Sequence, residues 1–170
     1  MKHILLLRHA KSSWKDLSLS DHNRPLNNRG ERTAPIMGQR LASKSHHPQH
    51  IISSTARRAW DTACIVAHEI NYDSKRIETN RSLFHAWPDE ICEVISTCDD
   101  SINKLMLVGH NPGMTMLANQ LLNSNSFENI PTAGLVTISI EINQWQEILN
   151  QDAISCTLLD YDYPKLMTFT

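Results

Sequence analysis

The sequence lacks any apolar segment of about eighteen residues or more, the length at which a run reads as a membrane-spanning helix. Its apolar run near the N-terminus, residues 4–7, holds only four residues and ends at Arg8 and His9. Such a run is too short to be the apolar region of a signal peptide. We therefore expect a protein that is neither exported nor inserted into a membrane.

Cysteine is scarce, and its spacing forms no C-x-x-C motif. This spacing argues against a small domain held together by disulfides. Three of the four cysteines stand among apolar residues, so we expect buried, reduced thiols in a cytoplasmic protein. The four are Cys64, Cys92, Cys98 and Cys156.

A strong net charge of either sign is also missing. The 16 Lys and Arg residues and the 18 Asp and Glu residues give a net charge of −2, which argues against a protein that binds nucleic acid or an anionic membrane. The distribution is uneven, because residues 1–60 carry eleven basic and three acidic residues, a net charge of +8. Either this region binds an anion, or the fold mixes the charges in space.

What the sequence does contain is the composition of a globular domain. It has 170 residues, of which 41% are apolar and 20% charged, and we expect one domain over residues 1–170. A chain of this length buries roughly 70% of the surface that its unfolded form exposes. The core therefore needs no metal or crosslink, and we expect no cofactor.

Short aliphatic stretches alternate with segments of helical periodicity. The pattern predicts strands at 4–7, 51–54, 104–109 and 135–140, and a further edge strand at 153–159. It predicts helices at 30–43, 56–70, 89–97 and 114–122, where Pro35 implies either a later helix start near Thr33 or a kink. The alternation predicts an α/β fold, a three-layer sandwich with a mostly parallel central sheet and helices on both faces.

Basic residues and histidines follow three of these strands. Arg8 and His9 end the first strand, Arg58 comes shortly after the second, and His110 follows the third. Because ligands bind at the carboxyl ends of the strands in open α/β sheets, we expect these side chains to meet. The connection after the first strand, residues 10–29, is long for an α/β fold, and such loops are usually functional or mobile.

The expected group of side chains suits one chemistry. Two imidazoles and two guanidinium groups with no carboxylate beside them in sequence favour a dianion such as phosphate or sulfate, because guanidinium groups bind phosphate oxygens bidentately. A neutral histidine can also attack phosphorus and form a phosphohistidine that water later hydrolyses. The start of the helix after the second strand adds backbone N–H donors for an anion.

Four blocks of the sequence together resemble the histidine phosphatase superfamily. They are Leu7-Arg8-His9-Ala10-Lys11-Ser12-Ser13-Trp14, Arg24-Pro25-Leu26-Asn27-Asn28-Arg29-Gly30, Ser53-Ser54 with Arg58-Ala59 and Thr62-Ala63, and Val108-Gly109-His110-Asn111-Pro112-Gly113. Within the superfamily the chain is most similar to the small phosphohistidine phosphatases of the SixA type. The resemblance implies the phosphoglycerate mutase-like fold. Ala10 stands where the superfamily more often has glycine, a variation that also occurs in the SixA type.

The resemblance implies a role for each matched residue. His9 is expected to be the nucleophile that becomes phosphorylated, and Arg8, Arg58 and His110 are expected to form the phosphate pocket. Arg58 rather than Arg57 is the match, because the arginine of the family directly precedes the alanine of this block. We expect the side chain of Arg57 to be solvated.

The implied activity is the metal-independent hydrolysis of phosphohistidine in a partner protein, for example a phosphotransfer domain, in signal transduction. Two alternatives stay open: a sugar-phosphate or nucleotide phosphatase of the same superfamily, and a non-catalytic module that binds phosphohistidine. Lys11 and Ser12 either contact phosphate or substrate, or simply lie on an exposed loop.

Whether the site has a general acid helps to decide which substrate it can hydrolyse. Many members of the superfamily place a carboxylate in the segment that corresponds here to residues 77–90, to protonate an alkoxide leaving group, and Glu78, Asp89 and Glu90 are candidates without a distinguishing motif. The last two follow Pro88, as acidic residues in the first turn of a helix often do. If no acid is present, phosphohistidine is favoured, because imidazole, with a pKa of about 6.5, leaves more easily than an alkoxide.

Overall fold

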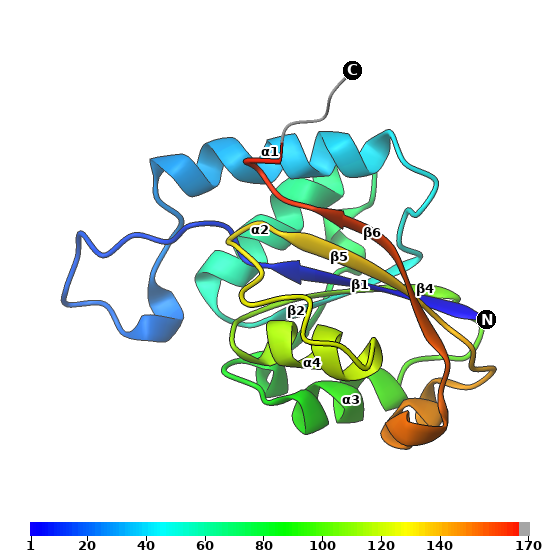
Figure 1. Cartoon of the computed structure of the whole chain (residues 1–170). Coiled ribbons are helices and arrows are strands. Elements are labelled where there is room, and N and C mark those ends of the chain that lie inside the picture. The colour runs from blue at the N-terminus through cyan, green and yellow to red at the C-terminus, as the bar shows by residue number, and fades with distance from the viewer. Residues whose placement is uncertain (167–170) are drawn as a thin grey trace.

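The computed structural model describes residues 1–166 and shows a central sheet between two layers of helices (Figure 1). The strands are β1 (Lys2–Arg8), β2 (His50–Ser54), β3 (Glu78–Asn80), β4 (Lys104–Gly109), β5 (Leu135–Ile140) and β6 (Cys156–Asp162). The helices are α1 (Asn28–Ala42), α2 (Arg57–Glu69), α3 (Pro88–Ser96) and α4 (Gly113–Leu121). The three-layer α/β sandwich predicted from the sequence is confirmed.

The six strands lie in the order β3-β2-β4-β1-β5-β6. The pairs β3/β2, β2/β4 and β4/β1 are parallel, whereas β5 runs antiparallel to both β1 and β6. The sheet is therefore mostly parallel, as predicted. The expected edge strand at 153–159 starts later, at Cys156, and the short polar strand β3 was not predicted.

The aliphatic run of β1 is continuous because both of its faces are covered. Ile4 and Leu6 belong to the core on the side of α3 and α4, while Leu5 and Leu7 belong to the core on the side of α1 and α2. Figure 1 shows the two helix pairs on opposite sides of the sheet. This double burial fixes β1 in the middle of the sheet, so the residue that follows it is held at a defined place.

Helix α1 begins at Asn28, after Asn27 has capped it by accepting a hydrogen bond from the N–H of Gly30 over 2.9 Å. Pro35 allowed two predictions, a helix start near Thr33 or a kink, and the first of these is therefore wrong. Pro35 lies inside the helix and leaves the carbonyl of Glu31 without its usual helical N–H partner.

The carboxyl ends of β2, β4 and β1 lie side by side. Arg8 is in register with Gly109, and Ser53 is in register with Val108. The loop of residues 10–27 leaves the sheet at this end and projects from it before the chain enters α1 (Figure 1). Among the described residues, no helix is long and apolar enough to cross a membrane.

Candidate active site

His9 directly follows β1 and is buried, with 8% of its surface exposed. Its ring Nδ1 lies 2.7 Å from the carbonyl oxygen of Ala10. A carbonyl oxygen can only accept, so Nδ1 carries the proton and Nε2 keeps its lone pair. The N–H of Ala10 donates in turn to the Thr62 hydroxyl on α2 over 2.9 Å, which holds this turn of the chain in place.

The surroundings of His9 keep its ring uncharged. Burial lowers the pKa of this imidazole most strongly, and the positive charges of Arg58 and Arg8 lower it further, against the opposing effect of the hydrogen bond to Ala10. The resulting pKa is about 3. The ring is therefore neutral at pH 7, so Nε2 is unprotonated and has the lone pair that an attack on an electrophile needs.

Arg58 stands in the first turn of α2 and is buried, with 3% exposed. Its Nε donates a hydrogen bond to Nε2 of His9 over 3.3 Å, so the guanidinium faces the unprotonated ring nitrogen. One terminal nitrogen donates to the carbonyl of Asp21 over 2.6 Å, and the other donates to its carboxylate over 3.1 Å. By contrast, the Arg57 side chain is 59% exposed and pairs with Asp61, as expected for a solvated neighbour.

His110 follows β4, and its ring centroid lies 5.1 Å from that of His9. Its Nε2 is 2.8 Å from the hydroxyl of Ser54 at the end of β2, so this contact joins two strand ends. Burial, followed by the nearby His9 and Arg58, lowers the pKa of His110 to about 2. This second ring is therefore also neutral at pH 7.

Two buried polar atoms at this end of the sheet have no hydrogen-bond partner among the described residues: Nδ1 of His110 and Nε of Arg8. The guanidinium of Arg8 donates from another nitrogen to the carbonyl of Ile130 over 2.7 Å. Buried polar atoms without partners are rare in proteins. A bound phosphoryl group could supply the missing contacts, so both atoms support an anion site.

Asp21 is the carboxylate of the site, and it was not among the residues predicted from the sequence. It lies in the short 3-10 helix η1 (Asp21–Asn23) and accepts hydrogen bonds from Arg24, Arg58 and His85, at 2.9, 3.1 and 2.8 Å. Partial burial raises the pKa of its carboxyl, but Arg24, Arg58 and His85 outweigh that effect and lower it to about 2. The spacing of Asp21 and Arg24, three residues apart in the long loop, was the available signal.

His85 and Phe84 complete the side chains around the two histidines. Phe84 packs edge-on against His110, with ring centroids 5.5 Å apart. His85 has a positive φ of 54°, and its ring centroid lies 5.8 Å from that of His110. Its side chain is 57% exposed, so it lies at the mouth of the site while His9 lies at the floor.

The remaining sequence candidates take other positions. The side chain of Lys11 is exposed, and the hydroxyl of Ser12 accepts a hydrogen bond from Arg24 over 2.8 Å. Glu78 pairs with His50 at 3.0 Å. These are the first residues of β3 and β2, so the pair lies away from the carboxyl ends of the strands. Glu90 accepts from the N–H of Trp87 over 2.8 Å and Asp89 shares the first turn of α3, as the alternative reading of these two acids predicted.

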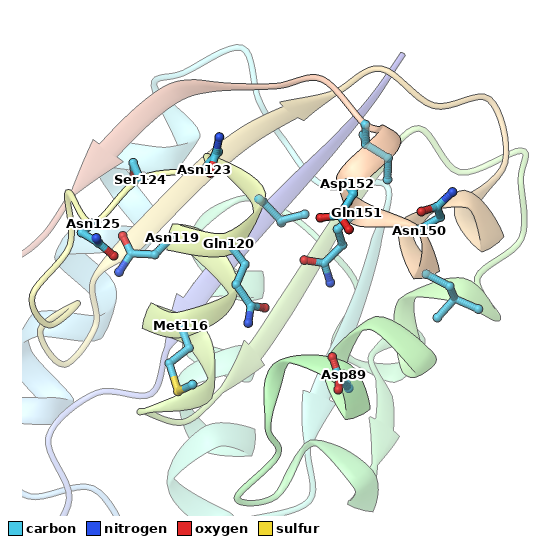
Figure 2. Close-up of a pocket in the computed structure, with 13 residues that line it drawn as sticks. Asp89, Met116, Asn119, Gln120, Asn123, Ser124, Asn125, Asn150, Gln151 and Asp152 are labelled. Carbon is cyan, nitrogen blue, oxygen red and sulfur yellow. The ribbon is translucent and has the colours of Figure 1, made fainter.

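A separate groove lies away from the histidines and arginines of the site. Figure 2 shows this groove of about 860 Å³, which is lined by Asn119 and Gln120 of α4 and by Asn150, Gln151 and Asp152 of the chain after β5. Of the acidic candidates described above, Asp89 lines this groove, whereas His9, Arg58 and His110 do not. The groove is rich in amide side chains, and no histidine or arginine lines it. It therefore lacks the imidazole and guanidinium groups that lie at the strand ends.

The sequence of this chain is similar to those of known proteins. Residues 4–83 match the family pattern described as the histidine phosphatase superfamily (branch 1). An uncharacterized chloroplastic protein of Arabidopsis thaliana is 32% identical over 158 residues, which are 86% of this chain and 70% of that protein. This relative shows that the similarity extends well beyond the residues of the family pattern.

Solved structures share the fold. A structure from Agrobacterium tumefaciens, assigned as the phosphohistidine phosphatase SixA, matches with a TM-score of 0.78 at 25% identity over 96% of this chain and 98% of the other. A mycobacterial glucosyl-3-phosphoglycerate phosphatase in complex with VO3 matches with a TM-score of 0.67 at 15% identity, over 96% of this chain and 100% of the other. The fold thus occurs in phosphatases with different substrates.

The low pKa of His9 predicts a pH dependence of stability. An unfolded histidine takes up a proton near pH 6.5, whereas the folded ring does so only near pH 3, so the unfolded protein binds more protons between these values. The free energy of unfolding should therefore fall as the pH is lowered from 7 to 4.5. Urea unfolding should show a smaller fall in His9→Gln, but an unchanged fall in His68→Gln, whose side chain is exposed. Equal falls in all three proteins would contradict the buried neutral ring.

The two neighbouring arginines allow a matched test of the anion site. Arg58→Ala should weaken the binding of inorganic phosphate by at least about tenfold, because a charge-assisted hydrogen bond contributes about 1.5–3 kcal/mol. Arg57→Ala should change the affinity by less than about twofold, since that side chain is exposed. Isothermal titration calorimetry measures both. Equal losses would show that only net charge matters and that Arg58 forms no specific contact.

Proposed function

The chain belongs to the histidine phosphatase superfamily, and from this premise we propose that it is a protein phosphohistidine phosphatase that works through a covalent phosphohistidine intermediate on His9. The observation that carries the proposal is the state of His9. Its ring is neutral, its Nδ1–H donates to the carbonyl of Ala10, and its unprotonated Nε2 accepts a hydrogen bond from Arg58 in a buried cationic site.

In the first half of the proposed reaction, Nε2 of His9 attacks the phosphorus of the substrate. The P–N bond to the substrate imidazole breaks, and its electron pair stays on the departing nitrogen. Arg8 and Arg58 neutralise the phosphoryl oxygens, and His110 hydrogen-bonds to one of them through the ring nitrogen that Ser54 does not hold. Phosphoryl transfer depends mainly on positioning and on electrostatic stabilisation of this kind, so the arginines provide the charge that a metal ion provides in other phosphatases.

The acids near the site support phosphohistidine as the substrate. Asp21 is the carboxylate in contact with Arg58, and its pKa of about 2 leaves it ionised at pH 7 and unable to donate a proton. Glu78 pairs with His50, and Asp89 and Glu90 lie in the first turn of α3. An alkoxide leaves slowly unless it is protonated, and none of these four carboxyl groups offers it a proton, whereas imidazole needs much less help. A partner such as a phosphotransfer domain would present this leaving group.

The setting we propose is the cytoplasm, which agrees with four cysteines that form no disulfide. The rival function is a phosphomonoesterase for a small molecule. A sugar-phosphate phosphatase has the same fold, which supports the phosphomonoesterase as the alternative function. The two differ in the leaving group that the site must release.

A competition assay tests the proposed substrate. With equal concentrations of a phosphohistidine protein and a panel of sugar, nucleotide and serine phosphomonoesters, we expect phosphohistidine to be consumed at least about tenfold faster. The rate of phosphate release from each substrate is the measurement. His9→Ala should abolish release from all of them, while His68→Ala, an exposed substitution on α2, should leave the rates unchanged. Faster release from a phosphomonoester would favour the rival function.

A further inference from the structure

His85 takes no part in the first half of the proposed reaction. It lies in the turn between Leu83 and α3, held with a positive φ of 54°. Its Nε2 is 2.8 Å from a carboxylate oxygen of Asp21, from the loop on the other side of the site. Because its side chain is 57% exposed, His85 can exchange protons with solvent.

The contact with Asp21 fixes the tautomer of this imidazole. Asp21 is ionised, so its oxygen accepts, and Nε2 of His85 must carry the hydrogen. In neutral His85 the lone pair is then on Nδ1, which has no hydrogen-bond partner among the described residues. A carboxylate that orients an imidazole in this way is a recurring arrangement for a general base.

The position of His85 suits the second half of the reaction. The rings of His9, His110 and His85 follow one another at centroid distances of 5.1 and 5.8 Å, from the buried floor to the exposed mouth. Nε2 of His9 faces Arg58, and one carboxylate oxygen of Asp21 contacts both Arg58 and His85, at 3.1 and 2.8 Å, so His85 stands on the Nε2 side of the His9 ring. Water must attack the phosphorus of phospho-His9 in line, from the side opposite Nε2, and a base on this side of the ring can receive its proton.

We propose that His85, oriented by Asp21, is the general base that activates the water which hydrolyses phospho-His9. The oxygen of the water forms a bond to phosphorus, and its proton passes to Nδ1 of His85. The P–Nε2 bond breaks, and its electron pair returns to His9. Inorganic phosphate leaves, and His85 releases the proton to solvent. This inference rests on the proposed function, because it needs a phosphorylated His9.

The test separates the two halves of the reaction. His85→Gln keeps a side-chain N–H for Asp21 but has no group that accepts a proton. After rapid mixing with a peptide labelled with ³²P on histidine, labelled His9 should form within about threefold of the wild-type rate. It should then decay at least about tenfold more slowly, since general bases contribute about 10²- to 10⁴-fold. Phosphorylated protein should therefore accumulate during turnover.

The chain offers a matched control. His50 forms the same kind of pair with Glu78, at 3.0 Å, and it lies at the opposite end of β2 from the site. His50→Gln should therefore leave formation and decay of the label unchanged. Unchanged decay in His85→Gln would overturn the inference, as would an equal slowing of formation and decay, which indicates a structural role. If wild-type His9 is never labelled, the proposed function itself fails, an outcome distinct from both.

Discussion

The hydrogen bond from Nδ1 of His9 to the carbonyl of Ala10 decides what this site can do. It places the proton of the ring on Nδ1 and leaves on Nε2 the lone pair that the proposed attack needs. The bond is possible because β1 is buried on both faces and ends at a fixed place, and because Thr62 holds the N–H of Ala10. The geometry of the reactive atom is thus a consequence of how the central strand is packed.

The second constraint is electrostatic. Two neutral imidazoles lie beside Arg8 and Arg58, and Asp21 is the carboxylate that balances this charge. Burying cations without an anion is costly, so Asp21 stabilises the site before a substrate arrives. A phosphoryl group that enters brings two further negative charges to the arginines. The basic excess of residues 1–60 contributes to this balance, since both arginines and Asp21 belong to that part of the chain.

Those features of the site that depend on strand ends could be predicted from the sequence. A run of aliphatic residues identifies a buried parallel strand, and the residues that follow it are brought to one end of the sheet. His9, Arg58 and His110 meet for this reason. Their catalytic roles stay predictions until variants are measured.

The other features could not be predicted because no local pattern carries them. Asp21 lies in an irregular loop, and its contact with His85 joins residues 64 positions apart. Strand β3 was missed because its three residues are polar, so neither hydrophobic alternation nor an aliphatic run marks it. Ser54 was seen as part of a strand end, but its bond to His110 depends on the register between β2 and β4.

The central claim is that Nε2 of His9 takes the phosphoryl group, and identifying the phosphorylated atom tests it most directly. The protein would be mixed with a phosphohistidine substrate and quenched at once, and the modified residue would be located by peptide mass spectrometry and its ring nitrogen by ³¹P NMR. The account predicts phosphate on Nε2 of His9, since Nδ1 is committed to Ala10. Phosphate on Nδ1 or on another residue, or product release with no phosphorylated residue, would contradict it.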